Sequence, residues 1–203
     1  MSSALDRVHA VILAAGASRR FGRPKQLLAW RGKMLLQSAV DTTRALLDAR
    51  VTVVLGAHHD EILSAVDFGG VQVVVNEAWP EGVAASIRAG IAALPKDAEA
   101  ALLMLGDQPL IGALALQKLL DTWQNEPQCI AAAFYFETVG VPAVFPSAFF
   151  DELTILQGDR GAKRLLLKYE ANLLKTPLPE AELDIDTKDD FEQLTGISVP
   201  GSE

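Results

Sequence analysis

The stretch "VHAVILAAGASRRFGRPKQLL", residues 8–28, joins an apolar run to a glycine-punctuated loop that is rich in positive charge. Its first six residues have the near-continuous apolar character of a strand that is buried on both faces. Four cationic side chains follow within seven positions, namely Arg19, Arg20, Arg23 and Lys25. The stretch contains no acid, although the chain of 203 residues has a formal net charge of −8. Positive charge that is concentrated in one loop of an acidic protein indicates a site for a small anion.

The bulk composition is that of an ordinary globular protein, because half of the residues are hydrophobic and 22% are charged. A chain of this length can bury roughly 70% of its unfolded surface, so its core needs no disulfides. The net acidity argues against general nucleic-acid binding, and no run reaches the roughly 18 apolar residues of a membrane span. We expect one domain over residues 1–196, a frayed tail over 197–203, a cytoplasmic location, and neither a nucleic-acid nor a membrane partner.

Outward from this stretch, short runs of Val, Ile and Leu alternate with amphipathic segments. Strands are predicted over 8–13, 51–56, 71–75 and 101–105, and helices over 34–48, 60–66 and 83–93. Further on, helices are expected over 111–124, 147–153, 160–169 and 187–194, and strands over 129–136, 141–146 and 172–178. This alternation predicts an α/β fold: a doubly wound, mostly parallel sheet with helices on both faces. Such Rossmann-like sheets bind ligands at the carboxyl ends of their strands.

The loop after the first strand is neither a Walker A motif nor a Gly-x-Gly-x-x-Gly motif. Gly16 nevertheless lets the backbone approach a ligand closely, and successive N–H groups in a turn form an anion-binding concavity. Arg20 and Lys25 could hold a polyphosphate, one as a planar fork and the other as a point charge. The alternative is a solvated basic loop that caps an edge of the sheet.

Acidic residues follow the later strands. Asp107, in "GDQPL", comes directly after the apolar run 101–105 and is expected at the carboxyl end of a central strand. A carboxylate that faces a polyphosphate needs a divalent cation between them, and Mg²⁺ takes one or two carboxylates together with phosphate oxygens. Asp184 or Asp186, in "ELDIDTKDDF", could complete the site. The alternatives are a turn or cap at Asp107, and a helix cap at Asp186 or Thr187.

Five motifs in order resemble those of the MobA-like nucleotidyltransferase family, from about residue 8 to residue 194. They are "LAAGASRRFGRPKQLL" (13–28), "NEAWPEGVAASIRAGI" (76–91), "GDQPL" (106–110), "GDRGAKRLL" (158–166) and "DIDTKDDF" (184–191). The last two resemble the branch that contains molybdenum cofactor cytidylyltransferase. The loop sequence Ala14-Ala15-Gly16 also resembles that branch and favours CTP over GTP.

This resemblance implies a Mg²⁺-dependent transfer of CMP from CTP to the terminal phosphate of a molybdopterin cofactor. It implies nucleotide contacts from Leu13, Ala14, Ala15, Gly16, Ser18, Lys25, Gly82, Ser86 and Asp107. Lys25 and Arg20 would neutralise developing charge, and Asp107 with Asp186 would hold the metal. Asp159 and Arg160 would belong to the acceptor side, although a helix start is an equal explanation for them.

One departure from the branch bears on the acceptor. The branch often carries Gly-His-Pro where this chain has Gly140-Val141-Pro142. Two alternatives therefore stay open: another phosphorylated acceptor, or a non-catalytic partner that binds molybdenum cofactor and delivers it to a molybdenum hydroxylase apoenzyme. The scattered tryptophans Trp30, Trp79 and Trp123 are expected to serve packing rather than stacking on a ligand.

Overall fold

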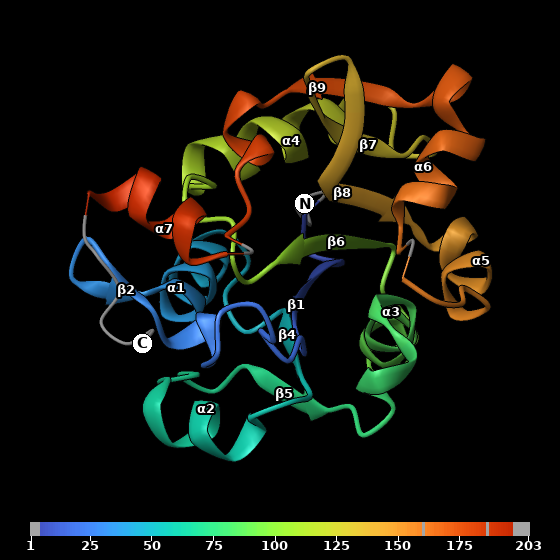
Figure 1. Cartoon of the computed structure of the whole chain (residues 1–203). Coiled ribbons are helices and arrows are strands. Elements are labelled where there is room, and N and C mark those ends of the chain that lie inside the picture. Colours follow the sequence, from blue (N-terminus) through green and yellow to red (C-terminus); the bar gives the residue numbers. More distant parts are fainter. Residues whose placement is uncertain (1–4, 160, 186, 197–203) are drawn as a thin grey trace.

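The computed structural model of the chain describes residues 5–159, 161–185 and 187–196. Its centre is a seven-stranded sheet with the strand order β5-β4-β1-β6-β8-β7-β9 (Figure 1). The strands are β1 (Val8–Ala14), β4 (Val51–Leu55), β5 (Gln72–Val75), β6 (Ala100–Leu105), β7 (Ala131–Tyr135), β8 (Thr138–Pro146) and β9 (Leu174–Pro177). Only β8 runs antiparallel to its neighbours β6 and β7 within this sheet. The predicted mostly parallel sheet is therefore confirmed.

Helices cover both faces of the sheet, as predicted. Alternate side chains of β1 point to opposite faces, and both sets are apolar, so each face needs a layer of helices to bury it. Ala10 and Ile12 pack in one core with α1 and α4, and Val11 and Leu13 pack in a second core with α3, α5 and α6. Figure 1 shows these two groups of helices on opposite sides of the sheet. The helices are α1 (Leu35–Leu47), α2 (His59–Ala65), α3 (Val83–Ala92), α4 (Ala113–Asn125), α5 (Phe150–Thr154), α6 (Lys163–Lys168) and α7 (Lys188–Thr195). Within the described ranges, no helix combines the length and the hydrophobicity that crossing a bilayer requires.

The main boundary error concerns the strand predicted over 141–146, since β8 already begins at Thr138. Tyr135 pairs with Thr138, so β7 and β8 form a hairpin with only Phe136 and Glu137 between them. Both turn residues have positive φ angles, 43° and 55°. Glycine and asparagine normally supply such conformations, so the turn has no recognisable sequence signal. The helix predicted over 160–169 likewise begins only at Lys163.

A third, smaller core connects the basic loop to the C-terminal part of the chain. Phe21, in the loop, is 1% exposed and packs edge-on against Phe191 of α7, with ring centroids 6.3 Å apart. Leu28, Leu35 and Ile185 complete this cluster. Burial of one phenylalanine stabilises by about 1.5–3 kcal/mol, so this small core fixes the loop relative to the segment that precedes α7.

Candidate functional site

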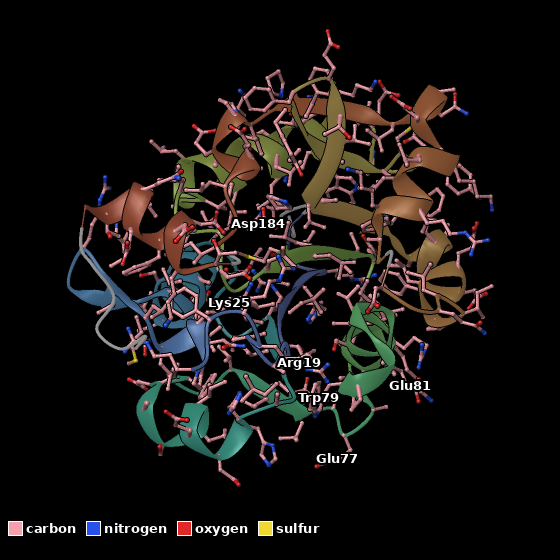
Figure 2. All side chains as sticks on the ribbon, in the orientation of Figure 1. Arg19, Lys25, Glu77, Trp79, Glu81 and Asp184 are labelled. Carbon is pink, nitrogen blue, oxygen red and sulfur yellow. The ribbon has the colours of Figure 1, made fainter. Side chains whose placement is uncertain are left out.

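A cleft of about 680 Å³ opens at the carboxyl ends of β1 and β6. It is lined by Leu13, Ala14, Ala15, Gly16, Ala17, Ser18, Arg19, Arg20, Lys25, Gln26, Trp79, Pro80, Gly82, Val83, Ser86, Leu105, Gly106, Asp107, Asp159 and Asp184. Every described residue that the sequence analysis assigned to the site is in this lining. Arg160 and Asp186 lie outside the described residues. Figure 2 shows Lys25, Arg19, Trp79 and Asp184 around the same central region.

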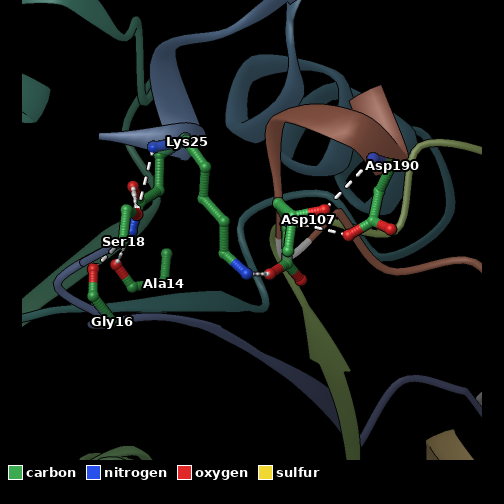
Figure 3. Close-up of polar contacts among 8 residues, drawn as sticks. Ala14, Gly16, Ser18, Lys25, Asp107 and Asp190 are labelled. Carbon is green, nitrogen blue, oxygen red and sulfur yellow. Dashed lines mark hydrogen bonds and ion pairs between the residues drawn. The ribbon is translucent and has the colours of Figure 1, made fainter. Parts of the chain in front are cut away.

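Lys25 and Asp107 meet across the cleft. The Lys25 Nζ atom lies 2.5 Å from Asp107 Oδ2, and the two side chains are only 14% and 13% exposed. Figure 3 shows the extended lysine side chain that reaches from the loop to the end of β6. At this low exposure, either charge without the other would be left poorly solvated, so each side chain stabilises its partner. The cation and the carboxylate predicted to flank a polyphosphate are therefore neighbours.

The basic loop is held in shape by side-chain hydrogen bonds to its own backbone. Ser18 has a left-handed backbone with φ 50°, and its Oγ accepts a hydrogen bond from Lys25 N at 3.1 Å. Gln26 Nε2 donates to the carbonyl oxygens of Ala14 at 2.9 Å and Gly16 at 3.1 Å. Gln26 is 2% exposed and escaped the sequence analysis, since its partners are backbone atoms of residues more than nine positions away. It fixes the loop from a buried position in the wall of the cleft.

We expect Gln26→Leu to lower the free energy of unfolding by about 1–3 kcal/mol, because two carbonyl groups lose a buried donor. Urea unfolding followed by circular dichroism measures the effect. Gln117→Leu is the matched control, since Gln117 is a half-buried helical glutamine whose amide donates to the side chain of Asp121 in the neighbouring turn and not to backbone carbonyl groups of a distant loop. It should shift stability by no more than about 0.5 kcal/mol. Equal unfolding midpoints for the two variants would contradict the role assigned to Gln26.

The opposite wall is built at the start of α3. Gly82 has φ 106°, and a Cβ atom there would overlap the Asp159 carboxylate and lie 2.9 Å from the Gly158 carbonyl. Glycine is thus required both by its conformation and by this close approach. Ser86 is 3% exposed, and its Oγ accepts a hydrogen bond from Asn76 Nδ2 at 3.2 Å. The start of α3 therefore lies directly against the segment that carries Asp159, and Ser86 connects the helix to Asn76.

Trp79 combines packing with a place in the cleft. Its Cβ lies 2.6 Å from where a Cβ on Gly56 would be, so the side chain is seated on the glycine at the end of β4. The half-buried ring lines the cleft. Trp123, in contrast, is 2% exposed in the core, as the packing prediction has it. The prediction for Trp79 is incomplete, because this residue packs on Gly56 and also lines the cleft.

The acidic segment before α7 lies against Asp107. Ile185 N donates to the Asp107 carbonyl oxygen at 3.2 Å, and Asp184 lines the cleft. Burial, together with the charges of Asp184 and Glu182, raises the pKa of the Tyr135 phenol above its ordinary value. Two carboxyl-bearing positions from distant parts of the sequence thus meet at one end of the sheet.

The cap of α7 is Thr187. Its Oγ1 accepts a hydrogen bond from Asp190 N at 3.2 Å, and the Asp190 carboxylate accepts one from Thr187 N at 2.7 Å. This reciprocal pair is a capping box. Thr187, one of the two cap candidates in the sequence, therefore caps α7, whereas the other candidate, Asp186, lies outside the described residues.

A family comparison agrees with this geometry. Residues 10–173 match the MobA-like NTP transferase domain, which is most of the chain. The chain belongs to this family. The resemblance seen in the sequence motifs is thereby confirmed, and a nucleotidyltransferase fold explains why the cleft lies at the carboxyl ends of the strands.

Solved structures of other family members cover almost the whole chain. A Rv0371c homologue from Mycobacterium sp. strain JC1 is 34% identical, with a TM-score of 0.82 over 93% of this chain and 95% of that chain. Rv0371c from Mycobacterium tuberculosis H37Rv, crystallised with manganese, is 31% identical, with a TM-score of 0.78 over 94% of this chain and 98% of that chain.

A curated relative matches a shorter stretch. Nicotine blue oxidoreductase from Paenarthrobacter nicotinovorans is 35% identical over 132 residues, which are 64% of this chain and 63% of that protein. The match thus spans less than two thirds of that relative's own length.

The donor set of this MobA-like cleft fits a hard divalent cation. Asp107 and Asp184 are two carboxylate residues that line this cleft. The described part of the chain contains no group of three or more His, Cys, Asp or Glu residues placed to hold a metal. Two carboxylates are the usual protein contribution to Mg²⁺ when phosphate oxygens and water supply the other ligands.

Proposed function

We propose that the chain transfers CMP from CTP to the terminal phosphate of a molybdopterin-type cofactor in the cytoplasm and releases pyrophosphate. The observation that carries this proposal is the close pair of Lys25 and Asp107, 2.5 Å apart and nearly buried in the cleft. This pair places an ammonium group that can bind phosphate oxygens next to a carboxylate that can bind a divalent cation, and a metal-bound triphosphate needs both when it replaces their direct contact. Family membership supports the reaction class, and the loop motif and the late motifs support the cytidylyl branch.

In the proposed reaction, an oxygen of the acceptor phosphate attacks the α-phosphorus of CTP. A new phosphorus–oxygen bond forms as the bond from the α-phosphorus to the bridging oxygen of pyrophosphate breaks, and that oxygen takes the negative charge. No protein nucleophile is needed, so the chain contributes positioning and charge neutralisation. Lys25 and Arg20 neutralise phosphate charge, and Gly82 lets the backbone approach the nucleotide.

Asp107 is the proposed principal ligand of a divalent cation, Mg²⁺ under physiological conditions. Asp184 is the second carboxylate that lines the cleft, and Asp186 is the other candidate from the sequence. When bound, the cation neutralises the triphosphate and stabilises the leaving pyrophosphate. The manganese complex of Rv0371c, a relative of 31% identity, supports a divalent-metal site in this group of proteins.

The nucleotide proposal depends on the backbone of the loop. Ala14, Ala15 and Gly16 bring only small side chains to the cleft, so a base can come close to their backbone, whose carbonyl groups already accept hydrogen bonds from within the protein. Gln26 holds two of these carbonyl groups, at Ala14 and Gly16. A rigid backbone edge can discriminate cytosine from guanine by its pattern of donors and acceptors.

The test is pyrophosphate release by the purified chain with CTP, GTP, ATP or UTP, each with Mg²⁺ and with molybdopterin cofactor as acceptor. We expect CTP to have the highest kcat/KM, with formation of the cytosine dinucleotide seen by mass spectrometry. Faster turnover with sugar phosphates or alcohol phosphates would replace the acceptor and keep the reaction class. No release with any pair, together with stable co-purification with a molybdenum hydroxylase apoenzyme, would favour a non-catalytic delivery role.

Trp79 offers a direct report on nucleotide binding. We expect CTP with Mg²⁺ to change tryptophan emission, because the half-buried ring lines the cleft and its environment changes when a base or ribose enters. Trp79→Phe should remove most of this change and retain an aromatic wall. Trp123→Phe, at a buried core position, is the control and should keep the change. A nucleotide-dependent signal that survives Trp79→Phe unaltered would place the nucleotide away from this wall.

A further inference from the structure

The segment 156–159 is held against the beginning of α3, and Asp159 lies at its end. Ala84 N, in the first turn of α3, donates to the Gly158 carbonyl oxygen at 3.1 Å. The Asp159 carboxylate lies so close to Gly82 that any side chain there would overlap it. Because Asp159 and Gly82 both line the cleft, the shape of this wall depends on the segment staying in contact with the helix.

Arg88 connects the two pieces of chain that meet at this wall. Its Nη1 donates to the Leu156 carbonyl oxygen at 2.8 Å, and its Nη2 donates to Glu81 Oε2 at 2.6 Å. Leu156 lies three residues before Asp159, and Glu81 directly precedes Gly82. One guanidinium therefore connects α3 to both sides of the contact between Gly82 and Asp159.

Arg88 is not among the described residues that line the cleft. It lines a second hollow together with Glu81 and residues 154–158, and its side chain is 30% exposed. An exposed pair between Arg88 and Glu81 alone would contribute little to stability. Arg88 also donates to the backbone carbonyl of Leu156, and the planar guanidinium can hold these two acceptors at a fixed distance from each other. A lysine at this position could replace only one of the two bonds well.

We propose that Arg88 is a positioning residue, which holds segment 156–159 on α3 and so fixes Asp159 at the edge of the cleft. The inference rests on the proposed function for the role of Asp159, and on the hydrogen bonds alone for the role of Arg88. The amide of Ala84 is a specific reporter of the arrangement. Its hydrogen bond ends on Gly158, so its exchange with solvent accelerates when the segment leaves the helix.

The experiment combines amide exchange with a double-mutant cycle on the full chain. In Arg88→Ala, we expect exchange at Ala84 to accelerate about tenfold, the equivalent of 1.4 kcal/mol, with unchanged exchange in the interior of α3. Arg88→Lys should recover part of the protection. Arg7→Ala is the control, since Arg7 forms an exposed pair with Glu99 near the start of β1 and should leave Ala84 unaffected.

The cycle measures pyrophosphate release with CTP, Mg²⁺ and molybdopterin cofactor as acceptor. Arg88→Ala should lower kcat/KM about tenfold in the native background and less than about twofold in an Asp159→Ala background, because residues that act through one another are not additive. Unchanged exchange at Ala84 would overturn the proposal, and so would an equal loss of rate in both backgrounds. If the native chain releases no pyrophosphate, the proposed function fails, and the exchange at Ala84 still decides whether Arg88 positions the segment.

Discussion

Replacing Asp107 with asparagine should lower kcat for nucleotidyl transfer by about 10²–10³-fold and leave the fold intact. Asparagine has nearly the same size and keeps an oxygen that can accept from Lys25 Nζ, so the contact across the cleft survives. The charge that would hold a divalent cation against the phosphates is lost. Pyrophosphate release at saturating CTP measures the effect, and the urea midpoint verifies the fold.

Asp151→Asn is the matched control for this change. Asp151 is an exposed acid in the first turn of α5, so its replacement changes the net charge equally. It should leave kcat within about twofold of the native value, since exposed substitutions away from the site have small effects. Turnover by Asp107→Asn at a rate close to that of Asp151→Asn would show that Asp107 has no part in holding the metal.

Lys25→Met should raise the KM for CTP and lower kcat, with a combined loss in kcat/KM on the order of 10³-fold. Methionine keeps most of the length and apolar volume of the lysine stem and removes the ammonium group. Both parameters change because the phosphate charge is present in the bound substrate and increases on the leaving group. Steady-state kinetics separates the two effects, and calorimetry with CTP and Mg²⁺ measures binding independently.

Lys33→Met provides the comparison for Lys25→Met. Lys33 also pairs with an acid, since its Nζ lies 2.7 Å from Asp41 Oδ2, but the pair is exposed, at 51% and 38%. We expect native affinity for CTP from this variant, because a surface ion pair outside the cleft contributes little. An unchanged calorimetric titration for Lys25→Met would contradict the placement of the triphosphate beside Lys25.

The fold was predictable because its strands have a strong and simple pattern. Strand β1 (Val8–Ala14) is buried along almost its entire length, and such continuous apolar runs between amphipathic helices favour a parallel sheet. The errors lie where the chain turns without glycine. Phe136 and Glu137 form the β7–β8 turn with positive φ angles, and no local preference of these residues predicts that turn.

The residues of the candidate site that could be predicted are the charged residues and glycines that belong to a sequence motif. Lys25 and Asp107 are such residues, and they meet in the cleft. Gln26 and Arg88 are different, because each acts on backbone carbonyl groups of distant segments. An amide or a guanidinium on a helix or loop looks like an ordinary polar residue in the sequence. Only the tertiary structure reveals which carbonyl groups it holds.

The central claim is that a triphosphate and a divalent cation bind in the cleft beside Lys25 and Asp107, where they replace the direct contact between these two side chains. A crystal structure of the chain with a non-hydrolysable CTP analogue and Mn²⁺, recorded at a wavelength where manganese scatters anomalously, tests it most directly. We predict a manganese peak coordinated by the Asp107 carboxylate and by phosphate oxygens, with Lys25 Nζ in contact with the same triphosphate. A triphosphate bound outside the cleft, or manganese with no contact to Asp107, would contradict the account.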